Sequence, residues 1–317
     1  MPRFSQLAMV RLLGALAVLA LLLPSWLPLA PLSPQPLALA QSVPGGGAVY
    51  YVTERFDRGI ARVNVDAAGH ATVINDYISV LPASGPDSVI FDHHGRMLVS
   101  NPEAGTLSEI DPNARTITRP TISTTPLPFL ADLALDPRSD TVWVIRWSGN
   151  TVARVDPASG ATTLFQPSGI SNLGGIAFST SGRLFVGSHS GDVFGLDTTA
   201  AHVLRSAHTG GSPDGMTFDP SSGHLFTSSC GGLCELAVGT DAAPALTFLR
   251  VDQGTDGDGI AADGQGHILV TSGTSVNCLT LATGAVATVA SGIKSADDVA
   301  TASRLGQPPT PTMAVMS

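Results

Sequence analysis

The sequence predicts an all-β protein, a six-bladed β-propeller, from three observations. A phrase with an Asp, a short apolar run, a turn and a second apolar run recurs, most clearly at Pro213-Asp214-Gly215-Met216. Equivalent positions fall at 87, 131, 174, 214, 258 and 297, so the intervals are 44, 43, 40, 44 and 39 residues. No helical period interrupts the repeats. Four short antiparallel strands every ~40–45 residues are typical of propeller blades.

Strands are expected in the following order. The first unit has three strands, 48–53, 59–65 and 70–74, with a hairpin turn at 66–69. The second has 88–91, 96–100, 106–110 and 116–118, and the third 133–135, 141–145, 152–155 and 162–165. The fourth has 176–178, 183–186, 192–196 and 202–204, and the fifth has two runs within 212–227, then 233–236 and 245–249. The sixth has 260–261, 267–270, 276–279 and 285–289.

The two chain ends complete one blade together. Asp297-Asp298-Val299-Ala300 repeats only the first strand of a unit, and the first unit lacks that strand. Joining them removes the open edges that a linear array would expose. We therefore expect one propeller domain over residues 48–302.

The N-terminal segment resembles a secretory signal. Arg3 and Arg11 precede an apolar run over residues 12–23 that ends at Pro24, and Ala38-Leu39-Ala40 supplies a small-x-small cleavage pattern. We expect cleavage after Ala40, a linker over 41–47, and a secreted or periplasmic protein. An uncleaved anchor is the alternative. The Pro-containing residues 303–317 are expected to form a flexible tail.

Charge excludes some partners. The chain has 16 Lys and Arg and 25 Asp and Glu. Removing residues 1–40 takes away two Arg, which leaves 14 − 25 = −11. This balance argues against nucleic acid, which needs a basic surface, and against anionic membranes. We expect no membrane contact beyond the export signal, and a monomer.

The three cysteines favour a disulfide over a metal. Cys230 and Cys234 could close a small loop in an oxidising compartment, which leaves Cys278 as a buried thiol. A zinc site is the weaker alternative, because no His partners stand at ligand spacing.

The repeat resembles NHL-type repeats and the senescence-marker-protein/gluconolactonase superfamily over roughly Ala48 to Thr301, with Pro213-Asp214-Gly215-Met216 as the most particular match. The resemblance implies a six-bladed propeller and a divalent cation, Ca²⁺ or another, held by Asp side chains in the central channel. It also implies Asn ligands at two positions where this chain has Ala131 and Gly174, and these departures weigh against catalysis. Asn172 could compensate for one of them.

Four acidic residues begin innermost strands and should meet at one end of the channel, which we call the top. They are Asp87, Asp214, Asp258 and Asp297. Carboxylates around one axis repel unless a cation or proton intervenes, and Ca²⁺ accepts ~6–8 oxygen ligands. These residues are therefore the predicted metal ligands. The structural alternative is that each Asp caps backbone of a neighbouring blade. Asp132 and Asp298 are one residue further along and should point elsewhere.

The remaining Asp residues have a simpler interpretation. Asp92, Asp111, Asp136, Asp156, Asp219 and Asp263 fall in the turns expected at the bottom, where Asp bonds to nearby backbone. His93 and His94 share this position and are interpreted as solvated turn residues.

Top loops supply candidate ligand contacts: Arg146, Trp147, His189 and Asn101. Arg146 beside Trp147 suits a sugar or a carboxylate, while simple packing of Trp147 is the alternative. The first hypothesis is a propeller that binds a small molecule or protein at its top without chemistry of its own. The alternatives are a metal-dependent lactonase-type hydrolase and a metal-assisted lyase of the streptogramin-inactivating type, with His189 as its candidate base.

Overall fold

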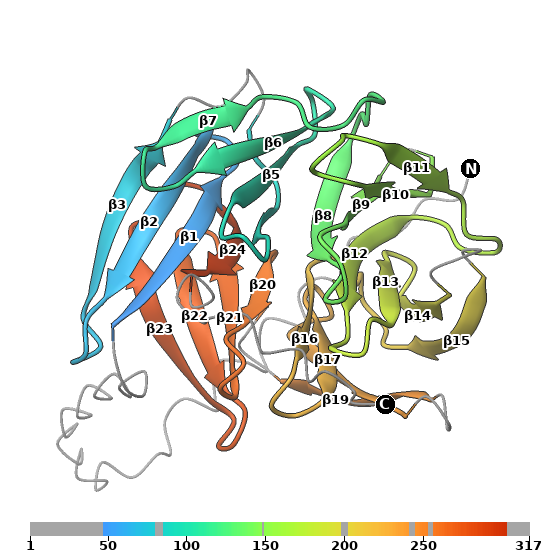
Figure 1. Ribbon diagram of the computed structural model, residues 1–317. Coiled ribbons are helices and arrows are strands. Elements are labelled where there is room, and N and C mark those ends of the chain that lie inside the picture. Colours follow the sequence, from blue (N-terminus) through green and yellow to red (C-terminus); the bar gives the residue numbers. More distant parts are fainter. Residues whose placement is uncertain are drawn as a thin grey trace, which may run out of the picture. The chain divides into compact units, whose positions relative to one another are not determined.

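The computed structural model describes residues 47–79, 85–147, 149–197, 202–240, 245–252 and 256–302. These residues form six four-stranded antiparallel sheets arranged as the blades of a ring (Figure 1). The prediction of a six-bladed, all-β propeller is confirmed. The predicted signal peptide and C-terminal tail lie outside the described residues.

The blades follow the chain in order. Blade 1 holds β24 (Ala296–Thr301), β1 (Ala48–Glu54), β2 (Gly59–Val65) and β3 (Ala71–Ile78), and blade 2 holds β4 (Val89–Phe91), β5 (Met97–Asn101), β6 (Thr106–Asp111) and β7 (Thr116–Arg119). Blade 3 holds β8 (Leu130–Leu135), β9 (Val142–Arg146), β10 (Thr151–Val155) and β11 (Thr162–Phe165). Blade 4 holds β12 (Leu173–Phe178), β13 (Leu184–Ser188), β14 (Asp192–Leu196) and β15 (Val203–His208). Blade 5 holds β16 (Met216–Asp219), β17 (His224–Thr227), β18 (Leu233–Val238) and β19 (Leu246–Asp252), and blade 6 holds β20 (Ile260–Ala262), β21 (His267–Ser272), β22 (Ser275–Thr280) and β23 (Ala285–Ser291).

Blade 1 closes the ring from both ends of the fold. Strand β24 pairs antiparallel with β1, with Tyr50 opposite Thr301 and Val52 opposite Val299. The predicted closure is therefore confirmed. In the described part of the chain, no helix is long and apolar enough to cross a membrane.

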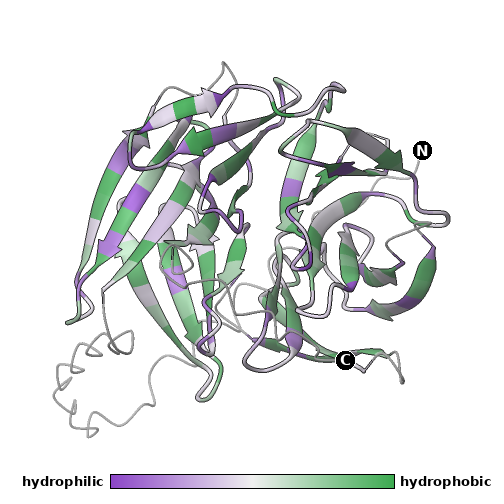
Figure 2. Cartoon of the chain, viewed as in Figure 1, coloured by the Kyte–Doolittle hydropathy of each residue, from purple (hydrophilic) through white to green (hydrophobic). Residues whose placement is uncertain are grey.

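The core lies between adjacent blades, and the burial of a strand depends on its position within the blade. Second strands such as β5 and β13 are buried at every residue, whereas the outermost β23 alternates between half-buried and exposed residues along most of its length. Side chains of neighbouring blades interleave in six apolar clusters, and Figure 2 shows hydrophobic residues concentrated on many inner strands. Since side chains alternate along a strand, each inner strand contributes to the packing on both of its faces.

The bottom turns have the predicted Asp chemistry. The Asp92 carboxylate accepts hydrogen bonds from the backbone N–H groups of His94 and Arg96, and Asp263 accepts those of Gln265 and His267. Each Asp thus holds a tight turn between the first and second strands of a blade.

A polar bridge crosses the channel below its top, and it consists of Asp298, Ser88 and Asp132. Asp298 Oδ2 accepts hydrogen bonds from Ser88 Oγ at 2.8 Å and from the backbone N–H of Val89 at 2.9 Å. Ser88 Oγ also lies 3.2 Å from Asp132 Oδ1. The bridge connects blade 1 to blade 2 and blade 2 to blade 3.

Asp132 extends the connection to two further blades. Its Oδ2 accepts the backbone N–H of Ile176 in blade 4 at 2.9 Å and that of Met216 in blade 5 at 3.3 Å. Asp132 Oδ1 also accepts the backbone N–H of Leu133 in its own strand at 2.8 Å. The two carboxylates therefore accept inner-strand N–H groups from four blades. The sequence offered capping of neighbouring blades as the structural alternative for the four predicted metal ligands. In the structure, Asp132 and Asp298 cap the backbone of neighbouring blades instead.

Hydroxyl groups at the ends of second strands make a further set of links between blades. Thr53 Oγ1 donates to the carbonyl oxygen of Asp87, and Ser228 and Thr271 donate to those of Asp258 and Asp297. Each hydroxyl thus holds the backbone of a predicted site residue at the start of the neighbouring blade.

We expect Asp132→Ala to lower the free energy of unfolding by ~3 kcal/mol, because it leaves backbone N–H groups of three blades without their acceptor. Urea denaturation at pH 5 measures this, since protonation there relieves repulsion between Asp132 and Asp298. The control is Asp111→Ala in an exposed turn, with an expected loss of about 1 kcal/mol. Equal losses in the two variants would contradict the bridging role.

Candidate functional site

The predicted carboxylates meet at the top of the channel. Asp87, Asp214 and Asp258 each lie two residues before the inner strand of a blade. Asp297 is the second residue of inner strand β24. Asp297 is in hydrogen-bonding contact with Asp87 and with Asp258, and Asp258 contacts Asp214. These four residues, together with Arg55, are called the carboxylate cluster. A hydrogen bond between two carboxyl groups requires a proton on one of them.

Arg55 supplies a positive charge within the cluster. It lies in the top loop between β1 and β2, and its Nη1 is 2.7 Å from Asp87 Oδ2 and 3.5 Å from Asp297 Oδ2. Its Nη2 lies 3.9 Å from Glu103 Oε1, so the loop of blade 2 joins the same network. The guanidinium therefore pairs with two of the four clustered aspartates and with Glu103.

Burial and mutual repulsion favour the protonated forms. Burial, only partly opposed by Arg55, raises the pKa of Asp87 to about 6. Burial and then the charges of Asp87 and Asp258 raise the pKa of Asp297, and burial also raises the pKa of Asp258. In the bridge below, burial raises the pKa of Asp298 to about 7 and that of Asp132 well above its ordinary value. The channel therefore holds protons near neutral pH.

His189 borders the cluster on the side of blade 4. Its Nε2 lies 3.6 Å from Asp214 Oδ1, and this carboxylate raises the pKa of the imidazole. A Cβ at Gly174 would lie 2.5 Å from the His189 ring, so no larger residue fits there while the ring keeps its place. The structure thus gives a physical reason for the glycine at a position where the resemblance implied Asn.

Exposed aromatic side chains stand in the top loops. Phe56 is 84% exposed, Trp147 52% and Phe129 47%. Phe56 follows Arg55 in the β1–β2 loop, Trp147 follows β9, and the backbone N–H of Trp147 donates to the carbonyl of Phe129 at 2.9 Å. These three residues, called the aromatic rim, place apolar surface on the same end of the propeller as the cluster.

Two other predicted ligand contacts, Asn101 and Arg146, are more buried than the aromatic rim. Asn101 is fully buried, and its amide donates to Thr106 and to Ser108 Oγ within blade 2. Its side chain therefore supports the top loop, while Glu103 carries the loop's contact to Arg55. Arg146 ends β9 and is half-buried beside Trp147.

The cluster does not fit a divalent cation as its side chains are placed. Among the described residues, no group of three or more His, Cys, Asp or Glu side chains is arranged to hold a metal ion. Arg55 already lies against Asp87 and Asp297. The cavity among the carboxylates measures about 20 Å³, room for about one water molecule or ion. The metal ligands stay a prediction, for which the side chains would have to rearrange.

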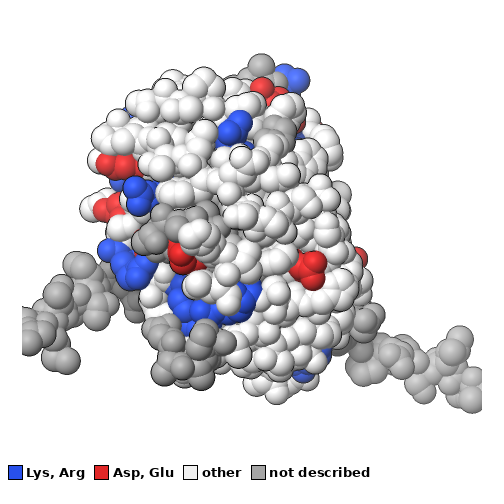
Figure 3. Space-filling view, turned by 90° about the vertical axis from the view of Figure 1, so that its right-hand side faces the viewer, with Lys and Arg blue, Asp and Glu red and all other residues white. Residues whose placement is uncertain are grey.

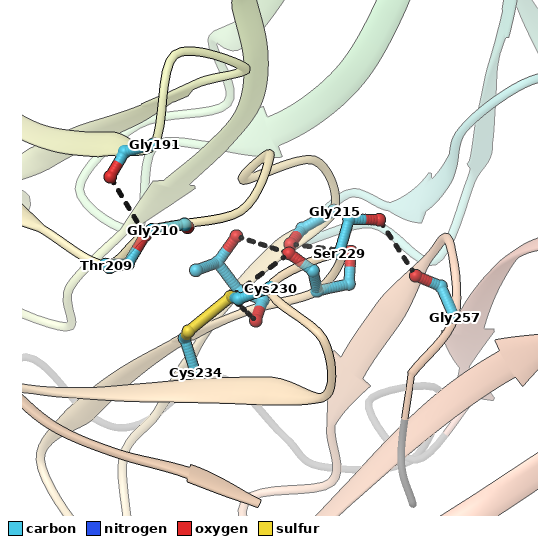
Figure 4. Close-up of a disulfide and its surroundings, with 10 residues drawn as sticks. Gly191, Thr209, Gly210, Gly215, Ser229, Cys230, Cys234 and Gly257 are labelled. Atoms are coloured by element: carbon cyan, nitrogen blue, oxygen red, sulfur yellow. Dashed lines mark hydrogen bonds between the residues drawn. A yellow bond between two sulfur atoms is a disulfide. The ribbon is translucent and has the colours of Figure 1, made fainter. Parts of the chain in front are cut away.

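A disulfide supports the top loop of blade 5 (Figure 4). Cys230 and Cys234 are joined, and the neighbouring Ser229 Oγ donates to the carbonyl of Gly257 at 3.2 Å. Cys278 is a buried free thiol, and burial raises its pKa to about 12. The structure agrees with the disulfide interpretation of the sequence.

Fold and site together define a six-bladed β-propeller with an acidic channel mouth and an aromatic rim. The chain belongs to the family described as a repeat of unknown function (DUF6923), whose model matches residues 47–208. No curated protein matches the chain. The likeness to NHL-type repeats and gluconolactonases stays a prediction.

Solved structures share the fold. A nidogen/laminin complex structure aligns with a TM-score of 0.63 and 15% identity, covering 81% of this chain and 98% of that chain. A functionally unknown protein from Desulfotomaculum acetoxidans aligns with a TM-score of 0.58 and 16% identity, covering 80% and 85%. The Cps50 β-propeller domain of Myceliophteria thermophila has a TM-score of 0.53 and 11% identity, covering 78% and 86%. Identities this low show a common fold alone.

Stability should fall as pH rises from 5 to 8. Asp87 and Asp298 hold protons in the folded state up to pH of about 6 and 7, whereas an unfolded Asp loses its proton near 3.8. The folded protein therefore binds more protons than the unfolded chain across this window, and each unit of pH removes stability. Urea denaturation at several pH values measures the slope. Asp298→Asn should flatten the dependence of stability on pH. A slope unchanged by this substitution would contradict a raised pKa of Asp298 in the folded state.

Proposed function

We propose that this propeller is a binding module that recognises a positively charged group, presented by a protein partner, at the top of its channel. The observation that carries the proposal is the charge of the carboxylate cluster. With every group ionised, four carboxylates and one guanidinium give −4 + 1 = −3. The raised pKa values mean that protons offset part of this charge, and a cationic group could replace them.

The aromatic rim suits the same ligand. Phe56, Trp147 and Phe129 expose apolar surface that water contacts unfavourably, and aromatic residues are enriched where proteins bind one another. A Lys or Arg side chain also gains from contact with an aromatic face. An acidic centre with aromatic surroundings therefore matches a basic side chain flanked by apolar residues.

The dimensions favour a protein surface over an enclosed small molecule. The cavity of about 20 Å³ admits a single water-sized group, far below the ~300–1,000 Å³ of small-molecule sites. The nidogen propeller is crystallised with laminin, so a propeller of this shape can belong to a protein assembly.

The face of the molecule drawn in Figure 3 carries few acidic side chains. On the face shown in Figure 3, charged side chains are sparse, and the largest charged group there is basic. Electrostatic attraction would direct a basic partner to the acidic cluster.

Calorimetry with the peptide acetyl-Gly-Gly-Lys-Gly-Gly-amide, its arginine counterpart and its Nε-acetyl-lysine form tests the proposal. We expect the charged peptides to bind and the acetylated one to bind at least tenfold more weakly, because a charge-assisted contact is lost. Asp258→Asn should weaken binding about tenfold, and Trp147→Ala by a few-fold.

The control is Asp111→Asn in a bottom turn, which should leave binding unchanged. Equal binding of the charged and acetylated peptides would contradict recognition of a cation. Calcium binding by the same calorimetry, with lactone hydrolysis that a chelator abolishes, would instead support the metal-dependent hydrolase. The lyase alternative would require His189 as a base, so His189→Gln should abolish elimination. Lactone hydrolysis that does not depend on a metal would exclude the metal-dependent hydrolase, and elimination that does not depend on His189 would exclude the lyase.

A further inference from the structure

The loop between β17 and β18, at the top of blade 5, connects two members of the carboxylate cluster through their backbone. Its first three residues, 228–230, are called the linking segment. Ser228 Oγ donates a hydrogen bond to the carbonyl oxygen of Asp258. The backbone N–H of Ser228 donates to the carbonyl oxygen of Gly215, the residue after Asp214, at 3.0 Å. One residue of the linking segment therefore helps to set the spacing between Asp214 and Asp258.

Ser229 adds a second pair of connections. Its Oγ donates to the carbonyl oxygen of Gly257 at 3.2 Å (Figure 4), and its own carbonyl oxygen accepts the N–H of Ser212 at 2.8 Å. Gly257 and Ser212 lie one and two residues before the two connected cluster members. A Cβ at Gly211 would lie 2.5 Å from Cα of Cys230, so the linking segment is also in close contact with that strand approach.

Strand pairing holds the equivalent hydroxyl groups of two other blades in place. Thr53 and Thr271 donate to the first residues of the neighbouring blades, and both lie within the paired residues of β1–β2 and of β21–β22. In blade 5 the pairing of β17 with β18 ends at Thr227, which lies opposite Cys234. Ser228 lies beyond this last pair, so strand pairing does not fix its hydroxyl.

The disulfide supplies the restraint that strand pairing does not. It joins Cys230, in the linking segment, to Cys234 at the last pair of the two strands. The closed loop holds Ser229 at a φ of 59°, a left-handed conformation that is unfavourable for a residue other than glycine. Because a cross-link removes alternative conformations of the loop it closes, the bond keeps Ser228 and Ser229 against their acceptors.

We propose that the Cys230–Cys234 disulfide is a redox switch of the carboxylate cluster: the oxidised loop holds the cluster in its cation-binding arrangement, and reduction by a dithiol opens the loop and weakens cation binding. This inference rests on the function proposed above, because it concerns the regulation of the same site. After reduction, Asp214 and Asp258 lose the restraint on their spacing, so the negative charge that faces a cation is less concentrated.

Burial directs the reductant to one of the two sulfur atoms. Cys234 is 0% exposed, whereas Cys230 is half-buried. A thiolate of the dithiol bonds to Cys230 Sγ, the S–S bond breaks, and Cys234 leaves as a thiolate. The second thiol of the reductant then attacks the mixed disulfide and releases Cys230. Two electrons and two protons pass to the protein, which gains two thiols, and the dithiol becomes a disulfide.

The first measurement needs no ligand and uses the full-length protein. The carboxyl ¹³C resonance of Asp258 is titrated by nuclear magnetic resonance in the oxidised protein and in the presence of dithiothreitol. Burial, and then the neighbouring charge of Asp214, raise the pKa of Asp258 in the oxidised structure. We expect reduction to lower this pKa toward its ordinary value, because the opened loop admits water and separates the two carboxylates. The titration of Asp156, in a bottom turn of blade 3, should be unchanged.

The second measurement is calorimetry with the peptide acetyl-Gly-Gly-Lys-Gly-Gly-amide. We expect reduced protein to bind it about tenfold more weakly than oxidised protein. Ser228→Ala keeps the disulfide but removes a connecting hydroxyl, so it should weaken binding by a few-fold in the oxidised protein. The double variant Cys230→Ala/Cys234→Ala should bind as reduced protein does, whether or not dithiothreitol is present. The matched control is Cys278→Ala, which removes the thiol in blade 6 and should keep the full response to dithiothreitol.

Failure of the switch and failure of the proposed function give different results. Oxidised protein that does not bind the lysine peptide would contradict the proposed function, and the Asp258 titration would still decide whether the disulfide controls the cluster. An Asp258 pKa that is equal in the two redox states would overturn the switch, as would equal peptide affinities in those states. Loss of the dithiothreitol response in Cys278→Ala would also overturn it. Thermal unfolding of each form confirms that the comparison is between folded proteins.

Discussion

The fold depends on the polar bridge of Asp298, Ser88 and Asp132 across the channel. Inner strands of a propeller leave backbone N–H groups facing the axis, where no further strand can pair with them. The two carboxylates accept N–H groups of Val89, Leu133, Ile176 and Met216, one from each of four blades. Ser88 joins the carboxylates to each other. Because two negative charges at this distance repel, the bridge itself retains protons. Ring closure and proton binding are consequences of one arrangement.

The carboxylate cluster is built directly on this bridge. Asp297 precedes Asp298 in β24, and Asp87 precedes Ser88, so alternation along the strand sends one side chain to the bridge and its neighbour to the channel mouth. Repetition in sequence therefore produces two stacked polar layers. The lower layer stabilises the ring, and the upper layer contacts Arg55 and His189 and carries the acidic groups that would bind a cation.

The repeat predicted the blades and their closure, because a period of about 40 residues has few structural solutions. It also placed Asp87, Asp214, Asp258 and Asp297 together. It did not predict the pairing of Arg55 with Asp87, which joins the first and second blades, nor the aromatic rim, because Phe129 lies outside the repeated phrase. The hydroxyls of Thr53, Ser228 and Thr271 were a missed signal, since Ser or Thr recurs where second strands end.

The carboxyl ¹³C resonances of the aspartates test the central claim most directly, when followed by nuclear magnetic resonance from pH 4 to 9. The structure predicts that at least one member of the carboxylate cluster stays protonated above pH 6, and that a bound lysine peptide lowers this pKa as the ammonium group displaces the proton. Titration of all four aspartates near pH 4, unchanged by the peptide, would contradict the account.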